Sequence, residues 1–524
     1  MNKFFKSFLG LLTATASGLT MSAQDQAPRL VVGLHIDQLN ANYLEWFKNG
    51  YGDNGFQELI KHGIQINHVV HATEKPDGAT ASANFATGSI PRAHGITGTS
   101  WYDPLTSKQI SCILDPSFLG NYTASTYSPA KLQGSTLADE LKEASNSEAK
   151  VYAIGIDPAQ TMLLAGHQAD GVFWGDDETE KWCTSTYYSP MPKWLENLND
   201  QSTIQNQLGE RTWTPLKALS YYENMPHKPN PTFFEYQFNQ VETSKFKAFK
   251  KSPLMNAAIL KMANELILRE NLGKDNITDY LVLQLSAAPK LGETKSGMEI
   301  QDLYYRLDDA LSNLLQAISQ ASGGQYCIYL TGSGATNDPI SNEAKTKTNF
   351  GDFYPQRCTS LLNLYLMALY GNEQWVTNWD HQQVYLNRQK IEQKGLNPSE
   401  FRKKAAAFLS EFSGVSSVLT YDQLLLETTN DLTRPKANAI FPERAADLYV
   451  ELLGGWNVKE SADQNDYRVN NASFSVPFLF YRPGQTAEKV VAPVQMENLT
   501  ASLATIFRIR PPNNCRGMSL PFLK

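Results

Sequence analysis

The stretch KPDGATASANFATGS, residues 75–89, concentrates small and hydroxyl-bearing side chains. This composition is typical of a turn that leads into the start of a helix. Free backbone N–H groups at a helix start attract anions, and a Ser or Thr hydroxyl placed there can attack a phosphoryl group. Thr80 and Ser82 are therefore candidate nucleophiles, although a helical turn over these residues would point both side chains elsewhere.

The eight histidines are the side chains with the clearest bearing on metal chemistry. None follows residue 381 and none lies between residues 228 and 380; they are His35, His62, His68, His71, His94, His167, His227 and His381. His68 and His71 are three residues apart, a spacing that places side chains on one side of a helix but on opposite faces of a strand. Because the residues around them predict a strand, we do not expect this pair to bind a metal.

Cysteines and net charge restrict the function classes further. The five cysteines are far apart and form no CxxC motif or Cys/His cluster, so they do not favour a zinc–thiolate site. The net charge is −7, from 46 basic and 53 acidic residues, with no long run of either sign. This balance argues against nucleic acid and against a strongly anionic lipid surface as partners.

Apolar runs of strand length recur along the chain, at residues 30–36, 151–156, 280–286, 326–332 and 476–481. They are continuous rather than alternating, as expected of strands that are buried on both faces of a parallel sheet. Helical patterns lie between them, at residues 135–144, 299–321 and 359–371. The alternation predicts an α/β fold in which helices cover both faces of a mostly parallel central sheet.

Two stretches interrupt this alternation, and we expect each to be an inserted subdomain. Residues 171–253 are rich in Trp, Tyr, Asn and Pro and predict a loop-rich, aromatic insertion. Residues 372–470 contain a helical segment of their own, PSEFRKKAAAFLSEF, and predict a second insertion, a small α/β cap. The core is then expected to comprise residues 24–170, 254–371 and 471–524.

Residues 1–23 have the pattern of a secretory signal peptide. Lys3 and Lys6 precede a short apolar run, and Ala23 is a small residue suited to cleavage. The run is too short and too rich in Thr, Ser and Gly to span a bilayer. We therefore expect an exported protein, periplasmic or at the cell surface or secreted, that does not span the membrane.

Longer phrases of the chain resemble those of a known family, in the family's order. They include LVVGLHIDQLNANYL, ATGSIPRAHGITGTSWYD, FWGDDETEKWCTSTYYSPMPKWL and TASLATIFRIRPPNNCRGMSLPF. The chain resembles the alkaline phosphatase superfamily, and within it the exported PafA-type phosphate-irrepressible alkaline phosphatases and the type I phosphodiesterases. The resemblance covers nearly all of the chain after the signal peptide. It implies an alkaline-phosphatase-like fold.

The resemblance also implies a site with two zinc ions, held by three Asp and three His, around a Thr or Ser nucleophile. The first ligand position carries Asp37, but the other ligand positions carry Pro289, Glu293, Ser333, Gly334 and Ser475. The nucleophile position carries Gly78, and Thr99 replaces an Asn. A Lys-x-Arg that would grip a phosphate monoester is replaced by Asp157, Pro158 and Ala159. We therefore expect the two-zinc site to be lost and no cofactor to be bound.

Several of the remaining polar residues have simple structural interpretations. Asp37 is either a relic of ligation or a side chain that accepts hydrogen bonds in the neighbouring turn. His94 and His167 are expected to be structural. Asp157 puts negative charge where the family has positive charge, which disfavours phosphate as a ligand.

Two hypotheses of function follow. The first is a pseudoenzyme of the cell envelope, catalytically silent and retained to bind or scaffold, with an envelope protein or a glycan as partner. The alternative is a divergent phosphoric-ester hydrolase with a rearranged site. In that case Thr80 or Ser82 would attack, and Asp37 and Glu293 would hold a single hard cation.

Overall fold

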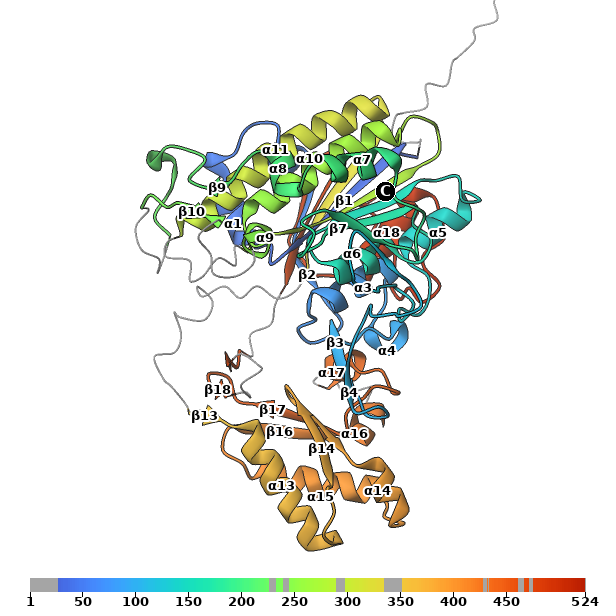
Figure 1. Cartoon of the computed structure of the whole chain (residues 1–524), viewed down its shortest axis with the longest axis vertical. Helices are drawn as coiled ribbons and strands as arrows, with labels where there is room; N and C mark the ends of the chain where they lie inside the picture. Colours follow the sequence, from blue (N-terminus) through green and yellow to red (C-terminus); the bar gives the residue numbers. More distant parts are fainter. Residues whose placement is uncertain are drawn as a thin grey trace, which may run out of the picture.

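The computed structural model describes residues 27–225, 232–238, 245–288, 297–333, 351–426, 431, 433–459, 466–470 and 475–523. The predicted signal peptide, and also Pro289, Glu293, Gly334 and His227, lie outside these residues. Within the described parts, the predicted mixed α/β fold is confirmed: a large central sheet is flanked by helices (Figure 1).

The central sheet has eleven strands. Ten follow one path, in the order β21 (Glu488–Val490), β2 (Ile64–Val70), β20 (Val476–Tyr481), β12 (Tyr326–Ser333), β1 (Leu30–Asp37), β11 (Asp279–Ser286), β6 (Val151–Gly155), β7 (Gly171–Gly175), β8 (Trp182–Ser185) and β5 (Gly120–Asn121). The eleventh, β22 (Val494–Gln495), also pairs with β2. All five apolar runs identified in the sequence form strands of this sheet.

Strand directions agree with a mostly parallel sheet, with one exception among the five predicted strands. β1 runs parallel to both β11 and β12, and β6 runs parallel to β11 and β7. β20 runs antiparallel to β12 and to β2. The chain leaves the carboxyl end of β12, forms the cap and returns to the same end of the sheet. It therefore needs no crossover, and the next strand must run in the opposite direction.

Helices cover both faces of the sheet because successive strand residues point to opposite sides. Leu30, Val32 and Leu34 of β1 join one buried apolar cluster, whereas Val31 joins the other. The first cluster is covered by α1 (Ala41–Trp46), α2 (Phe56–His62), α10 (Pro253–Arg269) and α11 (Met298–Ser322). The second is covered by α3 (Gly78–Thr87), α5 (Leu137–Ala144), α6 (Pro158–Ala165) and α18 (Met496–Phe507).

The predicted first insertion begins later than residue 171. β7 and β8 lie within residues 171–253 but are buried strands of the central sheet. Their aromatic residues, which suggested an insertion, are strand formers that fill the two faces of the sheet. The irregular region follows β8. Its elements are α7 (Lys193–Gln201), α8 (Ile204–Leu208), β9 (Thr212–Trp213), η3 (Leu219–Tyr221), β10 (Tyr236–Gln237) and α9 (Lys245–Lys250).

The second insertion has its own sheet and its own apolar cluster. The strands follow the order β14 (Val376–Asp380), β15 (Gln383–Leu386), β17 (Leu448–Leu452) and β16 (Val415–Thr420). The helices are α13 (Pro355–Tyr370), α14 (Arg388–Gln393), α15 (Pro398–Ser410), α16 (Tyr421–Leu426) and α17 (Arg434–Ala439). α13 was expected to belong to the core, yet Leu362 and Leu366 pack in the apolar cluster of the cap. A smaller sheet of β13 (Asp352–Phe353), β18 (Asn457–Val458) and β19 (Tyr467–Arg468) adjoins it.

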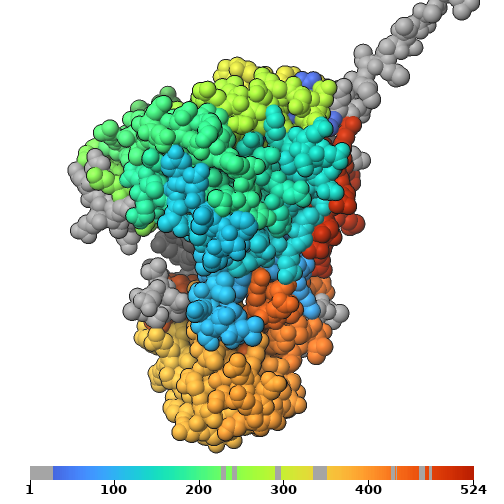
Figure 2. All heavy atoms as spheres, turned by 45° about the vertical axis from the view of Figure 1, so that its right-hand side comes forward, coloured from blue at the N-terminus to red at the C-terminus, as the bar shows by residue number. Residues whose placement is uncertain are grey.

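A hairpin of β3 (Ser100–Asp103) and β4 (Lys108–Ser111) joins the core to the cap. The rings of Tyr102 and Tyr385 lie 4.7 Å apart between centroids, and the guanidinium of Arg444 lies 4.3 Å from the centre of the Trp101 ring. Figure 2 shows the hairpin in blue against the orange surface of the cap. Aromatic and cation–π contacts between side chains of the hairpin and of the cap therefore hold the cap against the core. Among the described residues, no helix is long and apolar enough to cross a membrane.

Candidate functional site

The sheet brings two of the implied site positions, Asp37 and Ser333, to one edge. Asp37 ends β1, where it is in register with Ser286 of β11 on one side and Ser333 of β12 on the other. Carboxyl ends of parallel strands are the usual place for an active site in an open α/β sheet. At this edge the structure gives one carboxylate flanked by two serines.

The start of α3 is closed by a carboxylate of the chain itself. Asp77 is the N-cap residue, and its Oδ1 accepts a hydrogen bond of 2.8 Å from the backbone N–H of Thr80. Its Oδ2 accepts bonds of 2.6 Å and 2.9 Å from the N–H and hydroxyl of Thr99. A phosphate at a helix start uses such N–H donors and the positive end of the helix dipole. Here the carboxylate of Asp77 already occupies the place of such an anion at the start of α3, and its hydrogen bonds with Thr99 hold it there.

The side chain of Gln160 fills the space beside Gly78, the implied nucleophile position. A Cβ atom on Gly78 would lie 2.5 Å from Nε2 of Gln160, which is too close for a real contact. Gln160 is only 7% exposed, and its Oε1 accepts a 2.9 Å hydrogen bond from the hydroxyl of Ser333. This residue, which the sequence did not single out, thus ties α6 to β12 across the first residue of α3. A Thr at position 78 would have to displace it.

The position of the Lys-x-Arg motif carries no cation. Asp157 is the N-cap residue of α6 and accepts a 2.9 Å hydrogen bond from the N–H of Gln160. Burial raises the pKa of Asp157, and the charge of Asp77 raises it further. Ala159 is buried and adds no polar group. Two helix starts at this edge are therefore capped by carboxylates that influence each other, and both repel an anion.

The two candidate nucleophiles are not accessible. Thr80 is 3% exposed and Ser82 is fully buried. Neither hydroxyl has a hydrogen-bond partner among the described residues, and each oxygen is shielded from solvent. A substrate at the edge of the sheet could not reach either oxygen without movement of α3.

Ser475, at the last implied ligand position, lies against a histidine that the sequence had assigned no role. Nδ1 of His68 is 3.3 Å from the hydroxyl of Ser475. His68 lies where the pairing of β2 with β20 shifts register, between Ile66 and Val69, and it is exposed. His71 is directed elsewhere, with Nδ1 3.4 Å from the amide nitrogen of Asn84. Burial lowers its pKa to about 4.

Within the described ranges, no three His, Cys, Asp or Glu side chains are grouped in a way that could hold a metal ion. The implied positions Pro289, Glu293 and Gly334 lie outside those ranges. Asp37 is therefore the one described residue that matches the family's ligand set. One carboxylate does not hold zinc, which takes three or four ligands.

His94 has the geometry of a structural residue. It is fully buried, with Nε2 2.8 Å from Oδ1 of Asn84, and Nδ1 accepts a 3.1 Å bond from the N–H of Ile96. Burial lowers its pKa to about 3, so the imidazole is neutral. It fixes α3 to the turn that follows α4 (Pro91–His94).

His167 is held between two acceptors and should make stability depend on pH. Nδ1 is 2.8 Å from Oδ2 of the buried Asp139, and Nε2 is 3.1 Å from the carbonyl oxygen of Leu132. Burial alone lowers the pKa of His167, but the hydrogen bond and the charge of Asp139 outweigh it, so the net pKa is raised. The stabilisation by protonated His167 should be complete below its unfolded-state pKa of about 6.5 and lost as pH rises through the raised folded-state pKa.

We therefore expect His167→Gln to lower the melting temperature most at pH 6 and progressively less up to pH 9. Thermal melts of both proteins across that range would measure this. His62→Gln is the matched control, because His62 is exposed and lies 3.8 Å from Glu58. Equal losses at pH 6 and pH 9 would show that His167 contributes packing rather than charge.

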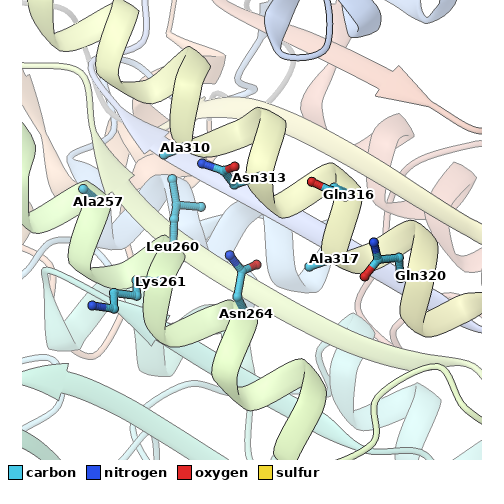
Figure 3. Close-up of a pocket in the computed structure, with 9 residues that line it drawn as sticks. All are labelled: Ala257, Leu260, Lys261, Asn264, Ala310, Asn313, Gln316, Ala317 and Gln320. Atoms are coloured by element: carbon cyan, nitrogen blue, oxygen red, sulfur yellow. The ribbon is translucent and has the colours of Figure 1, made fainter. Parts of the chain in front are cut away.

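A separate groove of about 560 Å³ lies between α10 and α11, away from the ends of the strands. Figure 3 shows amide side chains from both helices around it, among them Asn264 of α10 and Asn313 and Gln316 of α11. The lining contains no carboxylate, histidine or hydroxyl. Lys261 is the one ionisable residue of the lining, and no carboxylate, histidine or hydroxyl of the lining accompanies it, so we do not place the candidate active site there.

Comparison with known proteins places this geometry in a family. The model of the type I phosphodiesterase / nucleotide pyrophosphatase family matches residues 31–473. The chain belongs to this family of phosphoric-ester hydrolases, and the fold and ancestry expected from the sequence are confirmed.

Individual relatives are similar over nearly their whole length. Alkaline phosphatase PafA of Elizabethkingia meningoseptica is 26% identical over 98% of this chain and 97% of its own. A protein of Myroides odoratus named calcium-transporting ATPase is 27% identical, over 94% of each chain. The crystal structure of wild-type PafA superimposes with a TM-score of 0.81 at 25% identity, covering 94% of this chain and 98% of that one.

Proposed function

We propose that this chain is a pseudoenzyme, a member of a phosphoric-ester hydrolase family that does not hydrolyse phosphoric esters. The observation that carries the proposal is the contact at Gly78. The nucleophile position has no side chain, and the amide of Gln160, hydrogen-bonded to Ser333, takes its volume. Nucleophilic attack needs an accessible, activated oxygen, and Thr80 and Ser82 are both sealed from solvent.

The electrostatics of the edge support the same proposal. Asp77 and Asp157 cap the helices whose starts would bind the phosphoryl oxygens. In active metal hydrolases, zinc ions balance the carboxylates and polarise the phosphoryl group. Asp37 is the one matching ligand in the described ranges. A phosphate bound at this site would therefore face carboxylates whose negative charge is not balanced by zinc ions.

The role that we propose instead is binding or scaffolding in the cell envelope, after export, with an envelope protein or a glycan as partner. The predicted signal peptide supports export. The edge of the sheet, the irregular region after β8 and the cap are the surfaces available for contacts.

Assays of metal content and turnover test the proposal. We expect the protein, incubated with zinc and then desalted, to contain less than stoichiometric zinc. We also expect it to hydrolyse p-nitrophenyl phosphate and bis-p-nitrophenyl phosphate no faster than buffer. Asp37→Ala should behave like the native protein, and so should the control Asp53→Ala, whose side chain is 90% exposed.

The opposite outcome would establish the rearranged hydrolase. Stoichiometric metal and turnover that is abolished by Asp37→Ala but not by Asp53→Ala would show a working site at the end of β1. Repeating the assay with magnesium and manganese covers the case of a single hard cation held by Asp37 and Glu293. Loss of that activity in Glu293→Gln would then assign the second ligand.

A further inference from the structure

Helix α13 of the cap has two apolar faces, and one of them is exposed. Cys358, Leu362 and Leu366 are buried in the apolar cluster of the cap. Leu361 and Leu364 lie on the other face and are 36% and 58% exposed. Figure 1 shows α13 beside α15, in the part of the cap that is distant from the central sheet.

The exposed face has the spacing of a helix that packs against another helix. Arg357, Leu361, Leu364 and Ala368 are separated by four, three and four residues, and all four are exposed. This 3-4 spacing places side chains in one seam along an α-helix, as in coiled coils and most helical bundles. A helix buried on one face only would instead carry polar residues at these positions.

The seam is complementary to itself when two copies run antiparallel. A two-fold axis midway between Leu361 and Leu364 places each of these residues opposite the other. The same axis places Arg357 opposite Ala368. Arg357 then faces the small side chain of Ala368, while Leu361 and Leu364 pack against each other.

Charge favours the same orientation. Arg357 is the one charged residue of α13, and it lies in the first turn, where the helix dipole disfavours a cation. In an antiparallel pair it moves beside the C-terminal end of the partner's helix, where a cation is favoured. A parallel pair would instead bring the two Arg357 side chains together.

We propose that a second copy of this chain docks on α13, forming a symmetric dimer through antiparallel pairing of the two helices. Such an isologous contact closes at two copies. A helix of this length is about 24 Å long, and stable interfaces bury about 800 Å² on each partner. One helix face provides only part of that area, so the dimer should be weak, with a Kd of roughly micromolar order.

Sedimentation equilibrium of the full exported chain over a wide concentration range tests the proposal. The native protein should convert from monomer to dimer in the micromolar range. Leu364→Glu should weaken the dimer at least tenfold. Leu268→Glu on α10 is the matched control, because Leu268 is 59% exposed but lies outside the seam, and it should leave the Kd unchanged.

A second variant tests the orientation. Ala368→Glu places a carboxylate opposite Arg357 in an antiparallel pair, so it should tighten the dimer several-fold at low salt and lose the gain at high salt. In a parallel pair the same change sets two Glu residues together and weakens the dimer. The proposal fails if the native protein is monomeric at all concentrations, if Leu364→Glu and Leu268→Glu have equal effects, or if Ala368→Glu weakens association. Circular dichroism of each variant shows that it is folded.

Discussion

Replacing Asp302 by Ala should lower the free energy of unfolding by about 3–5 kcal/mol and release the irregular region after β8 from the core. Asp302 is fully buried in α11. Its carboxylate accepts hydrogen bonds of 2.6 Å each from the Trp213 indole, the Leu216 N–H and the Tyr222 hydroxyl. It also pairs with Arg306 at 2.9 Å. In the variant, the three donors lose their shared acceptor. Arg306, which is mostly buried, also loses the negative charge of Asp302 beside it.

Urea denaturation followed by tryptophan fluorescence measures the loss, and limited proteolysis between residues 212 and 225 measures the release. Asp309→Ala is the control, because Asp309 lies on the exposed side of the same helix, and its effect should stay within about 0.5 kcal/mol. An Asp302→Ala protein with native stability and native protease resistance would mean that packing of Trp213 and Tyr222 alone holds the region.

The strands, and the places of several implied site positions on them, could be predicted from the sequence because both are local properties. β1, β11 and β12 are continuous apolar runs, and the residue that follows or ends each strand can be read directly. Asp37 and Ser333 therefore fell at the ends of the strands where they were expected. The position of Gly78 at the start of a helix was equally visible in its small and hydroxyl-bearing neighbours.

The role of Gln160 could not be predicted in the same way. Its side chain meets Gly78 and Ser333, which are 82 and 173 residues away in the chain, because α6 packs against α3 beside the end of β12 and Gln160 reaches Ser333 there. No local pattern marks such a contact. The proximity of His68 and Ser475 also depends on the pairing of β2 with β20 and on the register shift within it.

Two errors of organisation have a common physical cause. β7 and β8 were assigned to an insertion, and α13 to the core, because apolar content shows that a segment is buried but not what it packs against. β7 pairs with β6, whereas α13 contributes Leu362 and Leu366 to the cluster of the cap. The sequence of α13 is apolar on both faces: one face is buried in the cap, and the other carries exposed leucines.

Replacing Gly33 by Ala should cost about 3 kcal/mol, at the upper end of the range for overpacking a core. Gly33 is in the middle of β1, and a Cβ there would lie 2.2 Å from the hydroxyl oxygen of Tyr329 and 2.3 Å from its Cζ. Tyr329 cannot easily move. It is fully buried, its hydroxyl lies 3.0 Å from Nε2 of His35, and its ring stacks on Phe85 at 5.4 Å between centroids.

The cause of that loss can be isolated with a double-mutant cycle in urea denaturation. Tyr329→Leu removes the ring and should cost about 3 kcal/mol by itself, as a large-to-small core change. If the clash is the cause, Gly33→Ala combined with Tyr329→Leu should cost about 2 kcal/mol less than the two single changes added together. Gly52→Ala, where the nearest atom to the new Cβ is 3.6 Å away, should have little effect. If the two changes are strictly additive, the strain of Gly33→Ala lies in the backbone of β1. The Tyr329 ring would then not be the reason for a glycine at this position.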